Sequence, residues 1–266
     1  MSEDEGVFTD EMAEKMWGGL LPLIEEMTER TQNPGEFVVE PRSQLAADDA
    51  KSHPYEVSHC ARMCLNAGVD HMHAAKSLMF DANKPLLHAS ADWSLIRGAL
   101  ENLAAAFWIL HPAQRTYRIE HALRWMVKNF KDQGNATDRL DLPNSKTTDE
   151  KVERVLQIGT GAGCKASEVR RGYFSTTVLK YVEKYSGSTN PYLMWQLCSG
   201  FAHGRPWASL SMNDMEILDS NDGDGVLSIK LTSDYKRILA AAWPAGQLMH
   251  AVVWLYMHRA KGVKSA

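Results

Sequence analysis

The stretch ADWSLIRGALENLAAAFWIL, residues 91–110, decides the fold of this chain. It contains no proline, and apolar residues occupy almost every side of the helix that it would form. A helix that is apolar all round must be enclosed by other elements, so residues 91–110 are predicted to form the central helix. Three polar residues, Ser94, Arg97 and Glu101, recur at helical spacing within it and share one face.

Helical periodicity also dominates the rest of the chain. Thr9 is a suitable N-cap for a first helix, and Pro112 is suited to the first turn of a fourth helix. The period changes at 215–231, where two β-prone runs flank the turn NDGDG and predict one hairpin. The sequence therefore predicts an all-α protein, a helical bundle of about seven helices with one small β-hairpin insertion.

We expect a single helical domain over residues 1–266. The apolar C-terminal segment is nearly long enough to span a membrane, but Pro244 and its polar residues favour a kinked helix in the core. The predicted parts are an N-terminal helix and extended loop at 1–50, a helical core at 54–206, the β-hairpin at 207–232 and a C-terminal helix at 233–266.

Charge and cysteine content restrict the classes of function. The formal net charge is -4, so no global positive field draws the chain to nucleic acid or to a membrane. The four cysteines lack the spacing of a disulfide framework or of a zinc site, which predicts reduced thiols and a cytoplasmic location. The N-terminus has no secretory-signal pattern, and no motif predicts a metal or another cofactor.

A second polar row lies on the predicted helix at 190–204, where His203 is the last member. Because an ionised side chain is costly to leave unpaired in an apolar interior, Arg97 and Glu101 are expected to pair with each other and with this row. The cluster is either a polar network that fixes helix register or a working site in which His203 serves as acid, base or ligand donor. The candidate catalytic residues are His203, Arg97 and Glu101, and the candidate ligand-binding residues are Tyr192, Ser199 and Arg205.

The end of this helix, SGFAHG at 199–204, resembles the AHG signature of the HEPN superfamily, compact helical proteins that include toxin and phage-defence ribonucleases. RGALENLAAAFW and RTYRIEHALRW are similar to an early core helix and to a tyrosine- and arginine-bearing helix of that superfamily. The resemblance covers residues 93–206, and His203 matches the family histidine. Ribonuclease members carry an arginine four to six residues before it, where this chain has Leu197, Cys198 and Ser199. The resemblance therefore implies the fold more strongly than the nuclease reaction.

The predicted fourth helix supplies the candidate surface for RNA. The segment carries several basic side chains and a single glutamate, Glu120. Contacts with phosphate need such positive charges. A solvated basic face is the alternative explanation. The candidate nucleic-acid-binding residues are Arg115, Arg118, Arg124 and Lys128.

Two hypotheses of different class follow. In the first, a HEPN-like helical module of the phage-defence or toxin kind binds RNA or a nucleotide. In the second, a helical protein or enzyme holds a small molecule at a buried site around Arg97, Glu101 and His203. A homodimer is a further hypothesis, and no membrane partner is expected.

Overall fold

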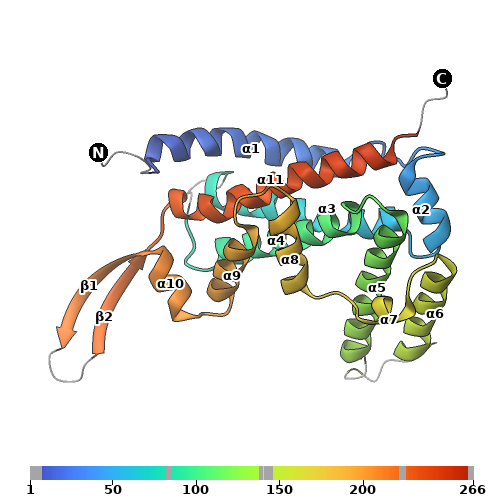
Figure 1. Cartoon of the computed structure of the whole chain (residues 1–266). Helices are drawn as coiled ribbons and strands as arrows, with labels where there is room; N and C mark the ends of the chain where they lie inside the picture. Colours follow the sequence, from blue (N-terminus) through green and yellow to red (C-terminus); the bar gives the residue numbers. More distant parts are fainter. Residues whose placement is uncertain (1–7, 82–85, 138–139, 141–145, 222–225, 263–266) are drawn as a thin grey trace, which may run out of the picture.

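The computed structural model describes residues 8–81, 86–137, 140, 146–221 and 226–262. Within these residues it contains eleven α-helices, one π-helical segment and a two-stranded antiparallel sheet (Figure 1). The predicted all-α fold with one hairpin is confirmed, whereas the expected count of about seven helices is too low. The elements in chain order are α1 (Asp10–Gln32), α2 (Gln44–Ser52), α3 (Val57–Lys76), η1 (Ser77–Asp81), α4 (Ala91–Leu110), α5 (Arg115–Thr137), α6 (Thr148–Gly161), α7 (Ala166–Arg170), α8 (Ser175–Tyr185), α9 (Pro191–Ala202), α10 (Pro206–Met212), β1 (Asp214–Asn221), β2 (Val226–Thr232) and α11 (Tyr235–Ala260).

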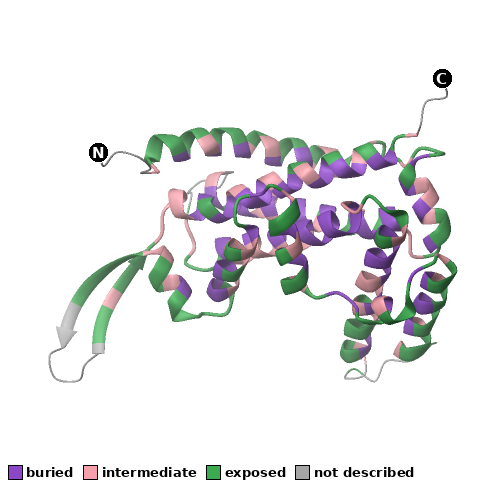
Figure 2. Cartoon of the chain, in the orientation of Figure 1, coloured by how far each residue is buried: buried purple, intermediate pink, exposed green. Residues whose placement is uncertain are grey.

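Helix α4 lies at the centre of the bundle, as its apolar sequence predicts. It packs against α3, α5, α8, α9 and α11, and most of its residues are buried (Figure 2). The contact with α3 is close because Gly68 has no side chain. A Cβ atom at Gly68 would lie 2.6 Å from Cγ of Leu103 on α4. Five helices therefore form a shell around one buried helix, and α1, α6 and α10 pack on members of that shell.

Helix α11 runs beside α1 and covers α4 (Figure 1). By length and composition it is the one described helix that could cross a membrane, and 67% of its most apolar window is buried inside the molecule. Pro244 lies within it, as predicted for a core helix. Near its end, the buried Arg259 donates hydrogen bonds to the carbonyl oxygens of Leu110, His111 and Pro112 at 2.6, 3.1 and 3.2 Å. These carbonyls lie at and just beyond the C-terminal end of α4, so Arg259 fixes α11 to that end and places a positive charge at the negative pole of the helix.

Helix α2 occupies part of the segment that the sequence predicts as an extended loop. The Ser43 hydroxyl accepts a hydrogen bond from the backbone N–H of Ala46 at 3.0 Å and caps the helix. On the next turn, the fully buried Asp48 accepts bonds from Nε and Nη2 of Arg118 at 2.6 and 2.9 Å. This ion pair joins α2 to α5. Because its two residues are far apart in the sequence, local sequence patterns do not reveal the pair.

Two other boundaries differ from the prediction. Residues 206–212 form α10, so the hairpin begins at Asp214 rather than at residue 207. Helix α5 begins at Arg115 rather than at Pro112. The carbonyl of Pro112 accepts bonds from Arg118 and Arg259 instead of continuing the helix. In this second case, one side chain of α5 itself and one of α11 satisfy the backbone group.

Replacing Arg118 with alanine removes the main partner of a fully buried carboxylate. Only Nε of Arg115, a half-exposed residue, remains within 3.2 Å of Asp48. We expect Arg118→Ala to lower the free energy of unfolding by about 3 kcal/mol, measured by urea denaturation followed by circular dichroism. Lys131→Ala on the exposed side of α5 is the matched control, with an expected change of less than about 0.5 kcal/mol. Similar small effects of both substitutions would contradict a stabilising role for the ion pair.

Candidate ligand-binding site

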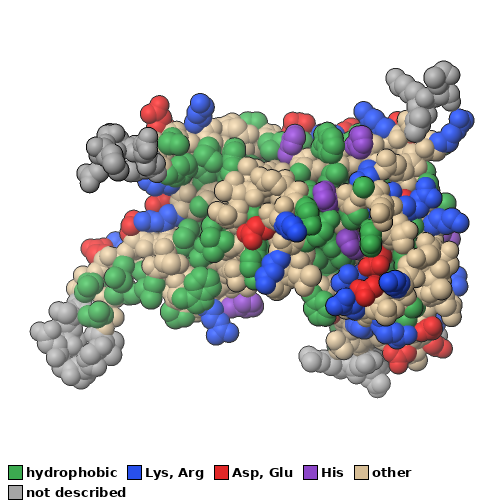
Figure 3. Space-filling model, in the orientation of Figure 1, with side chains coloured by type: hydrophobic (Ala, Val, Ile, Leu, Met, Phe, Trp, Pro, Cys, Tyr) green, Lys and Arg blue, Asp and Glu red, His purple; other side chains and the backbone are tan. Residues whose placement is uncertain are grey.

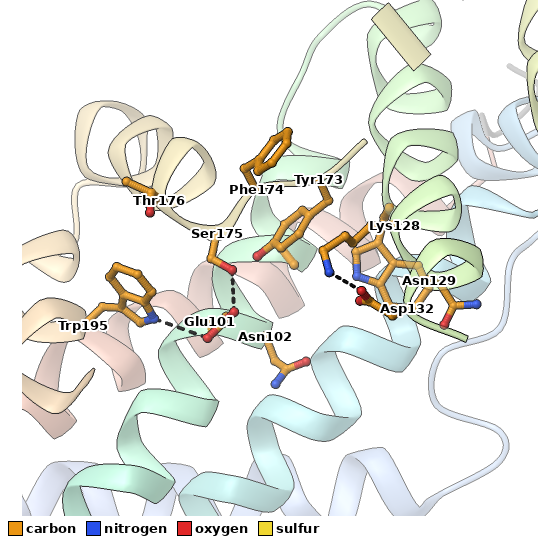
Figure 4. Close-up of a pocket in the computed structure, with 12 residues that line it drawn as sticks. Glu101, Asn102, Lys128, Asn129, Asp132, Tyr173, Phe174, Ser175, Thr176 and Trp195 are labelled. Carbon is orange, nitrogen blue, oxygen red and sulfur yellow. Dashed lines mark hydrogen bonds and ion pairs between the residues drawn. The ribbon is translucent and has the colours of Figure 1, made fainter. Parts of the chain in front are cut away.

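A cavity with a volume of about 500 Å³ opens between α4, α5, α8 and α9. Figure 4 shows that the side chains around it come from segments far apart in the sequence. Aromatic rings and polar groups alternate along the wall, which is typical of a site for a small organic molecule. The lining residues are Glu101, Asn102, Ala105, Trp125, Lys128, Asn129, Asp132, Tyr173, Phe174, Ser175, Thr176 and Trp195.

Glu101, predicted as catalytic, is the most contacted polar group of this wall. Its carboxylate pairs with Nη2 of Arg97 at 3.2 Å and accepts a bond from Nε1 of Trp195 at 3.3 Å. It also accepts a hydrogen bond from the hydroxyl of Ser175, the first residue of α8 (Figure 4). The first turn of α8 has no acidic residue of its own, so Glu101 supplies negative charge at the positive end of that helix. The expected pairing of Arg97 with Glu101 is confirmed.

Tyr173 presents a different kind of polar group to the cavity. It is 8% exposed, and its hydroxyl is buried near the Ser175 side chain without a well-formed hydrogen bond to a described residue. Burial raises the pKa of Tyr173, so the group stays protonated and can donate. The residue follows Gly172, whose φ of +73° favours glycine, and Nε of Arg124 donates to the Gly172 carbonyl at 3.0 Å. A turn held by Arg124 therefore places Tyr173 in the cavity wall.

The α5 side of the cavity carries a second ion pair. Lys128, predicted to contact nucleic acid, pairs with Asp132 one turn further along the helix. Trp125 and Asn129 complete this wall. Because Arg97 compensates Glu101 and Asp132 compensates Lys128, every charged side chain that lines the described cavity has a partner of opposite charge.

The predicted polar row of α9 lies in a neighbouring, more open recess of about 260 Å³. Within the described chain, neither Arg97 nor Glu101 has a hydrogen bond or an ion pair with His203, so the expected pairing with that row does not occur. The physical reason is Trp195. Its indole bonds to Glu101, lies 5.9 Å from the Arg97 guanidinium carbon and lines both spaces. The residues lining the open recess are Trp195, Gln196, Ser199, Gly200, His203, Arg205 and Trp207.

Tyr192 lines neither of these two spaces. Its ring stacks with Trp195 at a centroid distance of 6.2 Å, and the Lys180 ammonium lies 5.4 Å from the ring centroid. Of the three residues predicted to bind ligand, the structure thus brings Ser199 and Arg205 together with His203. Tyr192 contributes to the packing around Trp195 instead.

The predicted basic surface on α5 is not continuous, because two of its arginines point inward. Arg118 is 3% exposed and bound to Asp48. The Arg124 guanidinium lies 5.2 Å from the Trp108 ring centroid and is bound to the turn at Gly172. Arg115 and Lys128 reach the surface, and each has a carboxylate partner.

His121 on the same helix is also buried. Its ring stacks on Trp108 at a centroid distance of 3.8 Å, and its Nδ1–H donates to the Trp108 carbonyl at 2.7 Å. Burial lowers the pKa of His121 to about 4. The folded protein therefore holds this imidazole neutral.

Sequence reasoning missed most of the cavity wall. A search for polar residues at helical spacing does not select Trp195, which lies beside the α9 polar row, or Tyr173, which lies in a connecting segment. The signal that was available is the motif GYFS at 172–175, a glycine followed by two aromatic residues and a helix start. Nothing in that motif specifies that Glu101 lies opposite it.

No known protein gives an independent indication of function. The chain matches no family model, no curated protein and no solved structure. Among the described residues there is also no group of three or more histidine, cysteine, aspartate or glutamate side chains that could hold a metal ion.

The buried neutral His121 should make stability depend on pH. Between about pH 6.5 and pH 4 the unfolded chain binds a proton at this histidine and the folded chain does not, so stability falls as the pH decreases. A pKa shift from 6.5 to about 4 corresponds to a loss of about 3 kcal/mol across this window. Urea unfolding at several pH values should show a smaller loss for His121→Gln than for the wild type. The same slope in both proteins would contradict a buried neutral imidazole.

Proposed function

We propose that this protein binds a small, uncharged, planar organic molecule in the cavity between α4, α5, α8 and α9. The observation that carries the proposal is the wall of a cavity of about 500 Å³, where aromatic rings lie beside the Glu101 carboxylate, the Asn102 amide and Tyr173, whose buried hydroxyl has no well-formed hydrogen bond in the described chain. A cavity of this size, with aromatic rings and a few polar groups in its wall, is typical of a site that holds a small organic molecule.

The chemistry of the wall narrows the class of ligand. Trp125, Phe174 and Trp195 offer aromatic surface to a ring system. Nδ2 of Asn102 donates to the Gly98 carbonyl at 2.9 Å, which leaves its amide oxygen as an acceptor beside Glu101. A ligand that fits therefore has an acceptor for Tyr173 and a donor for Asn102 or Glu101. The compensated charges of the wall favour an uncharged molecule over a polyphosphate, which needs free cations.

A second candidate function is the binding of RNA or a nucleotide by a HEPN-like module, in a cytoplasmic defence or toxin setting. The observation that favours it is the open recess of α9 and α10, where His203, Arg205 and the 53% exposed Trp207 lie together. An aromatic ring and a guanidinium suit an unstacked base and its phosphate. This second proposal places the contact at α9–α10 rather than on α5, since Arg118 and Arg124 are occupied internally.

A Tyr173→Phe variant tests the first proposal. Nucleobases and nucleosides are the uncharged probes, and nucleoside triphosphates are the charged comparison. An uncharged probe should raise the melting temperature of the wild type, and Tyr173→Phe should bind it about tenfold more weakly, because one buried hydrogen bond is lost. The melting temperature of the free variant should change little, because Ser175 keeps its hydrogen bond to Glu101.

Tyr185→Phe, at a half-exposed tyrosine outside the cavity, is the matched control for calorimetric titrations. Equal affinities of the Tyr173→Phe variant and the wild type, or tighter binding of triphosphates than of nucleosides, would contradict the proposed ligand class.

For the second proposal, fluorescence anisotropy with a short single-stranded RNA at low salt is the measurement. Arg205→Ala and Trp207→Ala should each weaken binding by about tenfold, through loss of a phosphate contact and of a stacking surface. Arg115→Ala on α5 is the control and should bind like the wild type. An absence of RNA binding by the wild type at low salt would contradict this function.

A further inference from the structure

The hairpin β1–β2 projects away from the helical body (Figure 1). None of its side chains belongs to the hydrophobic core of the described chain or packs against that core. Its base is fixed, because Arg237 of α11 pairs with Asp214 through two contacts of 2.5 and 2.8 Å. The hairpin is therefore an arm whose base is held to α11 by this ion pair.

The register of the two strands separates their side chains onto two chemically different faces. On one face, Met215 lies opposite Leu231 and Ile217 lies opposite Ile229. On the other face, Glu216 lies opposite Lys230, and the two side chains form an ion pair at 3.3 Å. The apolar face consists of Met215, Ile217, Leu227, Ile229 and Leu231.

The apolar face is largely open to solvent. Met215, Ile217 and Leu227 are each more than half exposed. A two-stranded hairpin is marginal in water by itself, and a contiguous exposed apolar surface on a soluble protein marks a contact site. The pattern is that of a sheet with one buried face. In the described chain Leu231 lines a recess with Leu86 and Leu87, whereas Met215, Ile217 and Leu227 stay exposed.

The chemistry of this face suits a second copy of the same face. The charged residues of the hairpin whose side chains are described, Asp214, Glu216 and Lys230, lie on the opposite face or at its base, so two apolar faces can meet without bringing these charges together. In a dimer with a twofold axis, each favourable contact also occurs twice. Two short sheets that pack in this way form a small β-sandwich with a spacing of about 10 Å.

The size of the face sets the strength of this contact. Seven paired residues on each of two strands present a face of roughly 24 by 10 Å, so two faces cover together about 480 Å². A stable interface needs at least about 1,200 Å². Figure 3 shows hydrophobic side chains over the hairpin and over the neighbouring α9–α10 region on the same side of the molecule. There Trp207 and Leu210 of α10 are about half exposed and can extend the contact.

We propose that two copies of this chain associate through the apolar faces of their hairpins, in a weak, concentration-dependent dimer with a twofold axis near Ile217 and Ile229. This inference does not depend on the ligand proposed for the cavity. In this proposal the hairpin serves self-association, and the fold of the helical body does not depend on it.

Cysteine cross-linking tests the geometry directly, because all four native cysteines are buried and free. We expect Ile217→Cys, at the middle of the apolar face, to form a covalent dimer with a short bifunctional maleimide. Glu216→Cys, its neighbour on the polar face, should remain monomeric under the same conditions. The cross-link should be lost when Leu227→Lys is added to Ile217→Cys.

Sedimentation velocity over a concentration series gives a second measurement on the unmodified chain. The wild type and the polar-face control Ser228→Lys should show increasing mass with concentration, whereas Leu227→Lys should remain monomeric. The melting temperature of each variant should match that of the wild type, because the arm lies outside the core. Equal cross-linking of the two cysteine variants, or a wild type that is monomeric at every concentration, would overturn the proposal.

Discussion

The enclosure of α4 is the constraint on which the rest of this structure depends. A helix with apolar side chains on nearly every side gains stability only when other elements surround it, and five helices pack directly against this one. Its C-terminal carbonyls meet the same requirement, since a helix end inside the fold needs donors, and Arg259 supplies them. The core and the position of α11 thus follow from one buried helix.

The candidate site is a consequence of the few polar residues that α4 carries. Arg97 and Glu101 are partly buried, and their charges require partners. Trp195 from α9 and Ser175 from α8 provide hydrogen bonds to Glu101, so the carboxylate joins three helices beside the cavity. The turn before Tyr173 then places this residue in the wall of the same cavity. The same residues therefore hold the helices together and line the candidate binding cavity.

On α5, burial changes the role of two arginines that the sequence presents as part of a basic surface. Arg118 and Arg124 appear in the sequence as members of a positive face, but both guanidiniums are used inside the fold. Arginine suits this role because its planar group makes several directed bonds and its long side chain packs against rings. Arg124 is consequently a positioning residue for the turn at Gly172, and Arg118 is a link between α2 and α5.

The sequence by itself determined the helical class, the central place of residues 91–110, the hairpin and the pairing of Arg97 with Glu101, because each depends on local periodicity or on contacts one helical turn apart. Short helices such as α2 and α10 were missed. The Ser43 cap and the ion pair of Asp48 with Arg118 define α2, and α10, with seven residues, is too short to show helical periodicity. Only the tertiary structure decided that Trp195 takes the place expected for the His203 row beside Glu101. It also decided that Tyr173 completes the wall, because these residues are more than twenty positions apart along the chain and meet only when α8 and α9 pack on α4.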